Sequence, residues 1–427
     1  MTLGTSHNRE TTPLYERSRV NRPEVAVPPC PYPQTHARVI RNHEEAVEAA
    51  REIAALFAEE VALRDREGFL PLEEIDRFSQ SGLWAITVPE VYGGADLSFA
   101  TVTEVLKIIS AVDPSLGQMP HNHIAFIEHL KSDGTEEQKR FFFGEVLKGV
   151  RFGNAMSEPG NRPLNDMQTR LTPTEGGMLL NGVKAYATAA LLSHIVVITG
   201  KGDDGERYFA FVDRSAKGLK VVNDWSSFGQ RTTASGTVIA EDVFVTRDRL
   251  VPTSFAKGRP IAHGAVNQIL TAVVDLGIAK GTIEETIDFV RDKSRTWMDS
   301  GKANASEDPF TIQALGDLEI RLLAAEAMLD RAARLLDVAL ADPTEETTLA
   351  SSIATAAAKV LSTEIALAAT NKMFELAGTR STLSSHGLDR HWRNARTHTL
   401  HDPVRWKFFH VGNYYLNGIR PPKGAFI

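Results

Sequence analysis

Cysteine is almost absent from this chain of 427 residues, because Cys30 is the only one. A single thiol cannot form an intramolecular disulfide, so we expect a protein of a reducing compartment such as the cytoplasm. Basic residues do not dominate either, since 47 Lys and Arg against 54 Asp and Glu give a formal net charge of −7. Nucleic-acid binding needs a basic excess or stripe, so the expected partners are small molecules and not nucleic acid.

Long apolar runs are missing as well. The first ten residues, MTLGTSHNRE, contain no apolar core of the kind found in signal peptides. No later run approaches the roughly 18 apolar residues that a membrane span needs. We therefore expect neither export nor insertion into a membrane.

The spacing of proline and apolar residues predicts an arm followed by a helical domain. Residues 1–41 include PEVAVPPCPYPQ, whose prolines lack amide donors and favour an extended N-terminal arm. Residues 42–152 place apolar residues mostly three and four apart, which predicts an N-terminal helical domain. Within it, Thr135 and Gln138 have the spacing of a capping box.

The second half of the chain predicts a β domain and then a bundle, so the fold class is α+β. Residues 153–255 change to a two-residue period, with hairpin turns at Gly176-Gly177 and at Asp203-Asp204-Gly205, which favours a central antiparallel β-barrel or sandwich. Residues 256–427 contain three apolar-striped helical segments of roughly 30 residues each and a terminal helix, which predicts a four-helix bundle. Such long helices readily pack between subunits, so we expect an oligomer.

Common cofactor motifs are absent. GKGDDG at 200–205 has the glycine spacing of a dinucleotide loop, but ERYFAFV follows it and predicts a strand where that loop needs a helix. His398, His401 and Asp402 offer nitrogen and carboxylate ligands, yet no CxxC or HExxH element accompanies them. We therefore predict hydrogen-bonding histidines and no metal site.

The stretch from His391 to Gly418 joins imidazoles to an aromatic-rich helix. Asp402 followed by Pro403 predicts the N-cap and first residue of a terminal helix, which would end near Asn417 with Gly418 as its C-cap. A helix of this kind, rich in Trp, Phe and Tyr, can wall polar groups of a site against water. Earlier in the chain, PHNH offers His121 and His123, and a single histidine there would ordinarily be structural.

Other polar residues have two possible roles. Ser157 and Thr188 can bind the edge of a planar heterocycle and Tyr186 can lie against its face, but ordinary strand-end hydrogen bonding is equally compatible with their spacing. Arg295 and Arg380 stand near predicted ends of bundle helices. An arginine fork suits a phosphate, although most surface arginines are simply solvated.

The order of the domains, together with VPEVYGG, AMSEP and KAYAT, resembles the acyl-CoA dehydrogenase superfamily over about residues 45–420. LDRHWRNARTHTLHDPV, SRTW and DWSSFGQRTTASGT are similar to the flavin-dependent monooxygenases of that fold, especially the dibenzothiophene monooxygenase family and its relatives that act on sulfur compounds. The resemblance implies a flavin between the β domain and the bundle, with the terminal helix closing over it.

Carried over by position, the resemblance implies His123, His398 and Thr188 as catalytic groups, the two histidines beside the reacting edge of the flavin. Arg295 and Arg380 would hold the flavin phosphate, Arg295 across a subunit interface. The cofactor-binding residues that it implies are Asn154, Ser157, Tyr186, Thr188, Trp225, Arg295, Arg380 and His401.

The implied activity is that of a two-component monooxygenase. A separate NAD(P)H-dependent flavin reductase would supply reduced FMN, and O2 would form a flavin C4a-hydroperoxide that oxygenates a small, sulfur-containing substrate. A fixed imidazole donor would stabilise the developing negative charge by roughly 3 kcal/mol, and apolar closure would keep water out. A homotetramer is the expected assembly.

Three other activities stay open at this point. The same fold can N-hydroxylate an amine, or serve as an FAD-dependent acyl-CoA dehydrogenase with Asp402 as base, or act as a non-catalytic interaction protein. Pro159 after Ser157-Glu158 is similar to the AMTEP motif of true dehydrogenases, whereas Tyr186 and Thr188 replace the Phe and Ser of the dibenzothiophene enzyme. In medium-chain dehydrogenases a Tyr-Glu-Gly run supplies the base, and Asp402 is one methylene shorter than that glutamate.

Overall fold

The computed structural model describes residues 28, 30–160, 163, 166–253, 258–424 and 427. Most of the predicted arm, residues 1–27 and 29, lies outside the described residues. Its described remainder, residues 28 and 30–41, has neither helix nor strand and packs against the rest of the same chain. Tyr32 donates a hydrogen bond to the Asp213 carboxylate at 2.7 Å, and the Ala37 amide donates to the Leu147 carbonyl at 3.1 Å.

The N-terminal domain is helical, as predicted. The capping box is confirmed, because the Gln138 amide donates to Thr135 Oγ1 at 3.2 Å and the Thr135 amide donates to Gln138 Oε1 at 2.9 Å. Its helices are α2 (His43–Ala58), α3 (Val61–Glu67), α4 (Leu72–Gln80), α5 (Phe99–Val112), α6 (Pro114–Gln118), α7 (Pro120–Asp133) and α8 (Glu136–Leu147).

The β domain is one open, mixed sheet, and the predicted antiparallel barrel or sandwich is wrong. The strands follow the order β6-β7-β3-β2-β4-β5-β8, and β1 and β2 both pair in parallel with β4. A two-residue period identifies strands and their faces but not their partners, so the sequence could not fix this topology. The strands are β1 (Phe152–Ala155), β2 (Arg170–Thr174), β3 (Gly177–Lys184), β4 (Ile195–Gly202), β5 (Arg207–Asp213), β6 (Leu219–Val222), β7 (Thr237–Thr246) and β8 (Leu250–Pro252).

Both predicted hairpins are confirmed. β2 and β3 pair around Glu175 and Gly176, and β4 and β5 pair around the 203–206 turn, where Gly205 has a φ of 82°. GKGDDG is therefore the end of a strand and a tight turn, because the left-handed φ of its last residue favours glycine.

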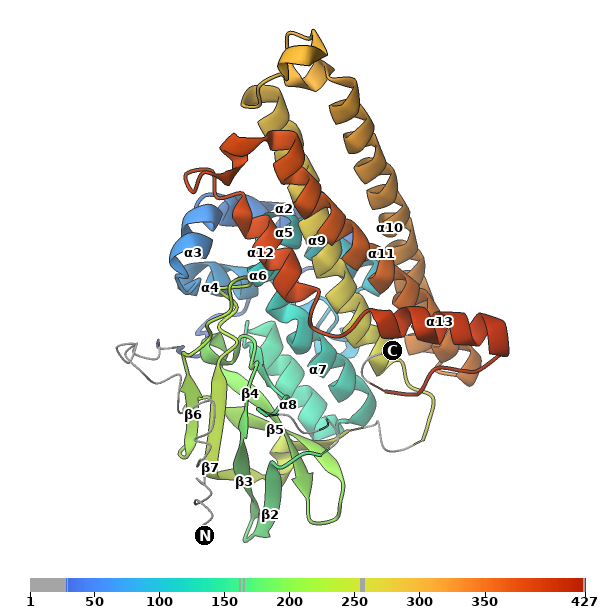
Figure 1. Ribbon diagram of the computed structural model, residues 1–427. Helices are drawn as coiled ribbons and strands as arrows, with labels where there is room; N and C mark the ends of the chain where they lie inside the picture. Colours follow the sequence, from blue (N-terminus) through green and yellow to red (C-terminus); the bar gives the residue numbers. More distant parts are fainter. Residues whose placement is uncertain (1–27, 29, 161–162, 164–165, 254–257, 425–426) are drawn as a thin grey trace, which may run out of the picture.

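The C-terminal part is a bundle of long helices, against which two short helices pack. The three long helices are confirmed as α9 (His263–Asp292), α10 (Pro309–Ala341) and α11 (Glu345–Ala377). α12 (Asp389–His398) lies against both α9 and α11, whereas α13 (Arg405–Asn417) contacts α11 and projects from the molecule (Figure 1). Among the described helices, α11 is long and apolar enough to cross a bilayer by composition, but 72% of that apolar window is buried inside the protein.

The predicted N-cap of the terminal helix is wrong. α13 begins at Arg405, and no side chain caps it. The Asp402 carboxylate instead accepts from His401 Nδ1 at 3.2 Å and pairs with Lys407 Nζ at 3.0 Å. Because only 1% of the Lys407 side chain is exposed, its ammonium needs a counter-charge more than an exposed helix end needs a cap. The predicted C-cap is confirmed, since Gly418 follows the helix with a φ of 67°.

The loop between β6 and β7 packs tightly onto α12 at Gly229. A Cβ added there would lie 1.9 Å from the Arg393 carbonyl oxygen, so only glycine lets the loop approach the helix.

We expect Gly229→Ala to push this loop from α12 and to lower the melting temperature by several degrees, as overpacking costs about 1–3 kcal/mol. Gly144→Ala is the matched control, because it lies inside α8 with nothing within 4 Å of the added methyl. Thermal unfolding followed by circular dichroism should show the control unchanged or slightly stabilised. Equal melting temperatures for the two variants would contradict the close packing.

Candidate functional site

A buried network of charges joins α9, α11 and α12. Asp275 from α9 accepts from His398 Nδ1 at 2.6 Å through one oxygen, and from Lys359 Nζ at 2.7 Å and Thr363 Oγ1 at 2.8 Å through the other. The side chains of Asp275, Lys359 and His398 are all 0% exposed. Burial alone would raise the pKa of Asp275, but the Lys359 ammonium and His398 outweigh it and lower that pKa to about 2. Asp275 is therefore an ionised carboxylate.

The outer nitrogen of His398 is left without a partner. Nε2 is buried and has no hydrogen bond among the described residues. Because the Nδ1–H group donates a hydrogen bond to Asp275, the neutral ring carries a lone pair at Nε2. Burial lowers the pKa of His398, while Asp275 opposes that shift. A neutral imidazole thus presents a proton acceptor to its surroundings.

His121 from α7 lies beside this network, together with His401. The centroids of the His121 and His401 rings are 6.0 Å apart. Burial lowers the pKa of His121 well below its ordinary value, and the neighbouring His401 and His398 lower it further. His401 is the accessible member of the group, with 36% of its side chain exposed. Three histidines from two distant parts of the chain therefore meet at one place.

His123 does not join them, contrary to the sequence-based expectation. Its Nε2 donates to the Trp84 carbonyl at 2.9 Å and its Nδ1 accepts from the Phe152 amide at 3.0 Å. Burial lowers the pKa of this ring to about 3. Both nitrogens are thus taken by the backbone, and none remains for a flavin. The catalytic role that the resemblance implied for His123 therefore has no support in its contacts.

The β domain brings four of the predicted cofactor residues together. The Asn154 side-chain amide donates to the Tyr186 carbonyl at 3.4 Å, and its backbone amide donates to the Thr188 carbonyl at 3.0 Å. Trp225 lies edge-on to the Tyr186 ring at 6.1 Å. Tyr186 is held at a left-handed φ of 54°, and 63% of it is exposed. Ser157 follows β1 and is partly exposed, and its carbonyl accepts from the Ala185 amide.

A chain of hydrogen bonds connects this group to α12. Thr188 Oγ1 lies 2.8 Å from Ser235 Oγ, which lies 2.7 Å from Thr233 Oγ1, and Thr233 donates to the Gln230 carbonyl. Trp225 Nε1 donates to the same carbonyl at 2.7 Å. The Gln230 amide in turn donates to Asn394 Oδ1 at 2.6 Å, one turn before His398. Gln230 and Asn394 both lie in stretches that carry the family resemblance, but no spacing in the sequence assigns either of them to the site.

Buried polar atoms without partners gather along this chain. Asn154 Oδ1, both side-chain amide atoms of Gln230, and His398 Nε2 are all buried and unsatisfied among the described residues. Orphaned atoms of this kind are costly unless a ligand satisfies them. A heterocycle with N–H and C=O groups at its edge, such as a flavin, has the chemistry to do so.

Arg295 and Arg380 lie at another end of the molecule. Both are exposed, and Arg380 donates to the Lys293 carbonyl just beyond the end of α9. Asp275 is 17 residues before that helix ends at Asp292, which corresponds to about 25 Å along its axis. Within one chain these arginines therefore do not reach the histidines, which fits the expectation that Arg295 acts across a subunit interface.

A second polar cluster has the residue types of a metal site. The ligand atoms of His129, Asp133 and His263 lie within 4.8 Å of one another. Asp133 is already paired with Arg259, and His263 Nε2 lies 3.1 Å from Ser132 Oγ. We interpret the cluster as a set of polar contacts that connects α7 to α9. The expectation of no metal stays a prediction.

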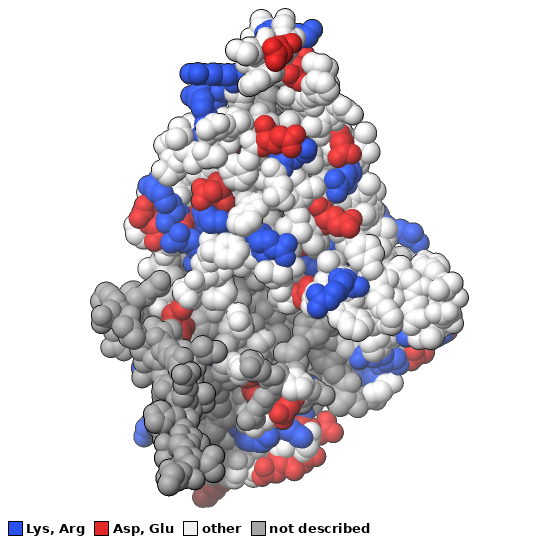
Figure 2. Space-filling model, viewed as in Figure 1, with Lys and Arg blue, Asp and Glu red and all other residues white. Residues whose placement is uncertain are grey.

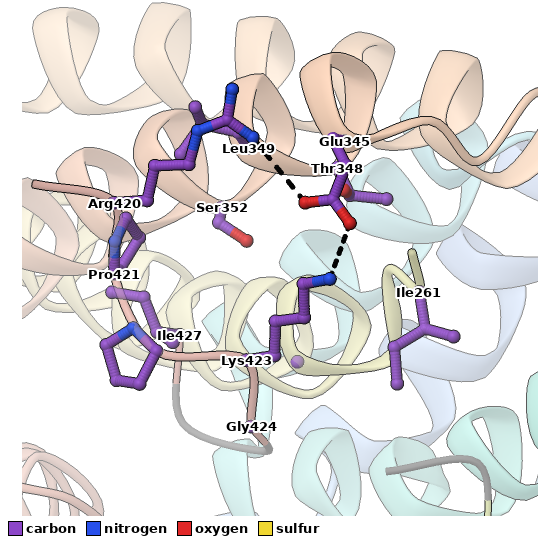
Figure 3. A pocket seen from close by; sticks show the side chains of 12 residues that line it. Ile261, Glu345, Thr348, Leu349, Ser352, Arg420, Pro421, Lys423, Gly424 and Ile427 are labelled. Carbon is purple, nitrogen blue, oxygen red and sulfur yellow. Dashed lines mark hydrogen bonds and ion pairs between the residues drawn. The ribbon is translucent and has the colours of Figure 1, made fainter. Parts of the chain in front are cut away.

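A cavity of about 60 Å³ lies elsewhere, beneath the chain that follows α13. Figure 3 shows Arg420 and Lys423 pointing to the Glu345 carboxylate beside it, at 3.5 and 2.5 Å. Its volume is far below the 300 Å³ or more of ordinary ligand pockets, and none of the three histidines lines it. It is therefore not the candidate site.

Comparison with known proteins agrees with this geometry. Residues 41–150 match the family described as "Acyl-CoA dehydrogenase, N-terminal domain", and residues 269–406 match "Acyl-CoA dehydrogenase, C-terminal domain". The dibenzothiophene monooxygenase of Mycolicibacterium goodii is 34% identical over 400 residues, which cover 90% of this chain and 96% of that protein. The probable FMNH2-dependent monooxygenase SfnC of Pseudomonas putida is 32% identical over 88% of this chain and 96% of its own.

A solved structure shows the same architecture. FMN-bound TdsC from Paenibacillus sp. A11-2 superposes with a TM-score of 0.86 at 30% identity, covering 90% of this chain and all of that chain. Identity above 30% over nearly the full length of a monooxygenase shows more than a shared fold. The chain belongs to the acyl-CoA dehydrogenase superfamily, in its branch of flavin-dependent monooxygenases.

Proposed function

We propose that this protein is the oxygenase component of a two-component system, in which reduced FMN and O2 oxygenate a small sulfur-containing compound. The observation that carries the proposal is the buried, unpartnered Nε2 of His398, fixed by Asp275 beside the polar edge of the β domain. The relatives named for dibenzothiophene and for FMNH2 support the choice of substrate class and cofactor. Reduced FMN, when bound, would supply the two electrons that activate O2.

The β domain would hold the flavin ring. The exposed Tyr186 ring offers a face for stacking, with Trp225 at its edge. Asn154, Thr188 and Gln230 would bind polar atoms at the edge of the ring, since two of them carry unsatisfied buried atoms. Arg295 and Arg380 of a neighbouring subunit would bind the phosphate.

The histidines would accept and donate protons next to the flavin. We assign to His121 the role that the sequence had suggested for His123, because His121 is the α7 histidine near His398. His398 would accept and return a proton at Nε2, and burial of the group would exclude water that diverts reduced oxygen to hydrogen peroxide.

The acyl-CoA dehydrogenase alternative is disfavoured by the state of Asp402. Burial raises the pKa of Asp402, but the hydrogen bond from His401 and the charges of Lys359 and Lys407 hold it below its usual value. A carboxylate that is stabilised in this way is a weak base for an α-proton. The N-hydroxylating alternative has no specific observation in its favour.

A separate flavin reductase would be the redox partner, because the sequence has no nicotinamide-binding unit and the relative SfnC is named for FMNH2. The single cysteine and the bacterial relatives favour a cytoplasmic location.

The proposed homotetramer would cover the apolar surface of α13. Lys407 is the only buried residue of this helix, and Figure 2 shows hardly any charge at its projecting end. Exposed apolar patches of this kind mark interfaces. The exposed large side chains of this region are Trp406, Phe408, Phe409, Tyr415, Leu416 and Ile419.

We expect Phe409→Glu combined with Leu416→Glu to shift the protein from tetramer to smaller species, because buried charges without partners destabilise an interface. Light scattering coupled to size exclusion measures the mass. Lys217→Glu, an exposed charge change in the β domain, should leave it unchanged. A tetramer that survives the double change would place the interface elsewhere.

The activity itself is tested by oxygen consumption with photoreduced FMN and a panel of thioethers, sulfones and amines. We expect stoichiometric oxygenation of a sulfur compound and none of an amine. Incubation with acyl-CoA and an artificial electron acceptor without oxygen should give no turnover. Acyl-CoA oxidation there would establish the dehydrogenase instead.

We expect His398→Ala and His121→Ala to bind FMN but to lose coupled product formation by roughly 100-fold, with O2 diverted to hydrogen peroxide, because general acid–base groups contribute factors of this size. Product and peroxide are measured together. His36→Ala, an exposed histidine, is the control and should stay coupled.

His123→Ala should behave differently. It leaves the Trp84 carbonyl and the Phe152 amide buried without partners, which costs roughly 2–4 kcal/mol of folding free energy. We expect a lower melting temperature with coupling retained in the folded fraction. A stable but uncoupled variant would restore His123 as a catalytic residue.

A further inference from the structure

The charge network behind His398 is fully buried between α9, α11 and α12. On α9, Asp275 has Val273, Val274 and Leu276 as neighbours, and all of them are buried. A buried ion pair is weak evidence for stability, because apolar residues of similar volume often serve as well or better. A fully buried carboxylate and ammonium therefore indicate a role in addition to holding the helices together.

We propose that Asp275 is a positioning residue that holds the proton of His398 on Nδ1, so that Nε2 faces the flavin site as a lone pair. The proposal rests on the proposed function and deepens it. It also replaces the expectation that His398 is a hydrogen-bond donor, because a neutral ring has one N–H and Asp275 already accepts it.

Lys359 and Thr363 explain why Asp275 can do this. Both bind Oδ2, at 2.7 and 2.8 Å, which leaves Oδ1 to His398 alone. The Lys359 ammonium also keeps the carboxylate ionised in a place that water does not reach. Without it, a buried carboxylic acid would compete as a donor and the tautomer of His398 would no longer be determined.

The groups around His398 come from four parts of the chain. Asp275 on α9 raises the pKa of His398, whereas Lys359 on α11 and His401 after α12 lower it. His121 on α7 and Asp402 also face the group. Of these groups, Asp275 alone both accepts a hydrogen bond from the ring and raises its pKa. Removal of Asp275 should therefore change both the tautomer and the pKa of His398.

An acceptor at Nε2 suits the overall reaction. A thioether, O2 and reduced FMN give a sulfoxide, water and oxidised FMN, so the two hydrogens of the reduced flavin end in the water. One of these protons can be taken up at Nε2 and returned there. Because the inner side of the ring is sealed by Asp275, the proton can leave only toward the site.

The test replaces Asp275 with asparagine. Its side-chain amide can donate to Nδ1, which moves the ring proton to Nε2 and inverts the tautomer. We expect coupled oxygenation by Asp275→Asn to fall by roughly 100-fold or more, with FMN binding retained. The acid limb of its pH profile should move to lower pH, since the carboxylate that raises the pKa of His398 is gone.

Nitrogen NMR of 15N-histidine-labelled protein reads the tautomer directly and needs no turnover. We expect a protonated Nδ1 in the wild type and a protonated Nε2 in Asp275→Asn. The double variant Asp275→Asn with Lys359→Met removes the unpaired lysine and serves if the single variant does not fold. Thr370→Val, a buried threonine further along α11 that bonds only its own helix, is the control for a merely structural change.

Two results would overturn the proposal. One is a protonated Nε2 on His398 in the wild type, and the other is a folded Asp275→Asn protein with coupled turnover within threefold of wild type. If the wild type itself shows no FMNH2-dependent oxygenation, the proposed function fails, and the NMR measurement still decides the role of Asp275.

Discussion

The Asp275 carboxylate, held between Lys359 and His398, is the interaction on which the architecture of the site depends. It connects α9, α11 and α12 at a depth where none of the three side chains is exposed. An unpaired charge there would cost several kcal/mol, so the helices can pack in this register only with all the partners present. The position of α12, and with it the orientation of His398, follows from one buried carboxylate.

The β domain is tied to the same helix by a second, neutral contact. The Gln230 amide donates to Asn394, and Gly229 lets the loop lie directly on the α12 backbone. A flavin ring held by Tyr186 and Trp225 would thus be placed against His398 through short connections on one helix. This arrangement places the short α12 at the site, whereas the aromatic α13 packs on α11 and projects from the molecule.

Local patterns in the sequence predicted local structure well, and the failures occurred where strand pairing or the burial of a charge decides. The capping box at Thr135, the two hairpins and the three long helices depend on neighbouring residues, and all are confirmed. The sheet topology depends on pairing with β4, which no spacing reveals. The role of Asp402 depends on the burial of Lys407, which lies only five residues later. A charge inside an apolar run, as in TAVVDLGIA around Asp275, is the signal that could have identified the missed network.

His121 and His123 differ in their contacts because they lie on different faces of α7. Residues two apart on a helix point to nearly opposite sides, so His121 and His123 meet different neighbours although both are buried. Phe126, Ile127 and Leu130 stand three, four and seven residues after His123 and are all buried in one apolar cluster with Phe152. His123 thus packs within that apolar cluster, and its imidazole satisfies two backbone groups where α7 meets β1. By bonding the backbone at that junction, His123 helps to fix α7 and so the position of His121. In this way His123 supports the site without contacting it.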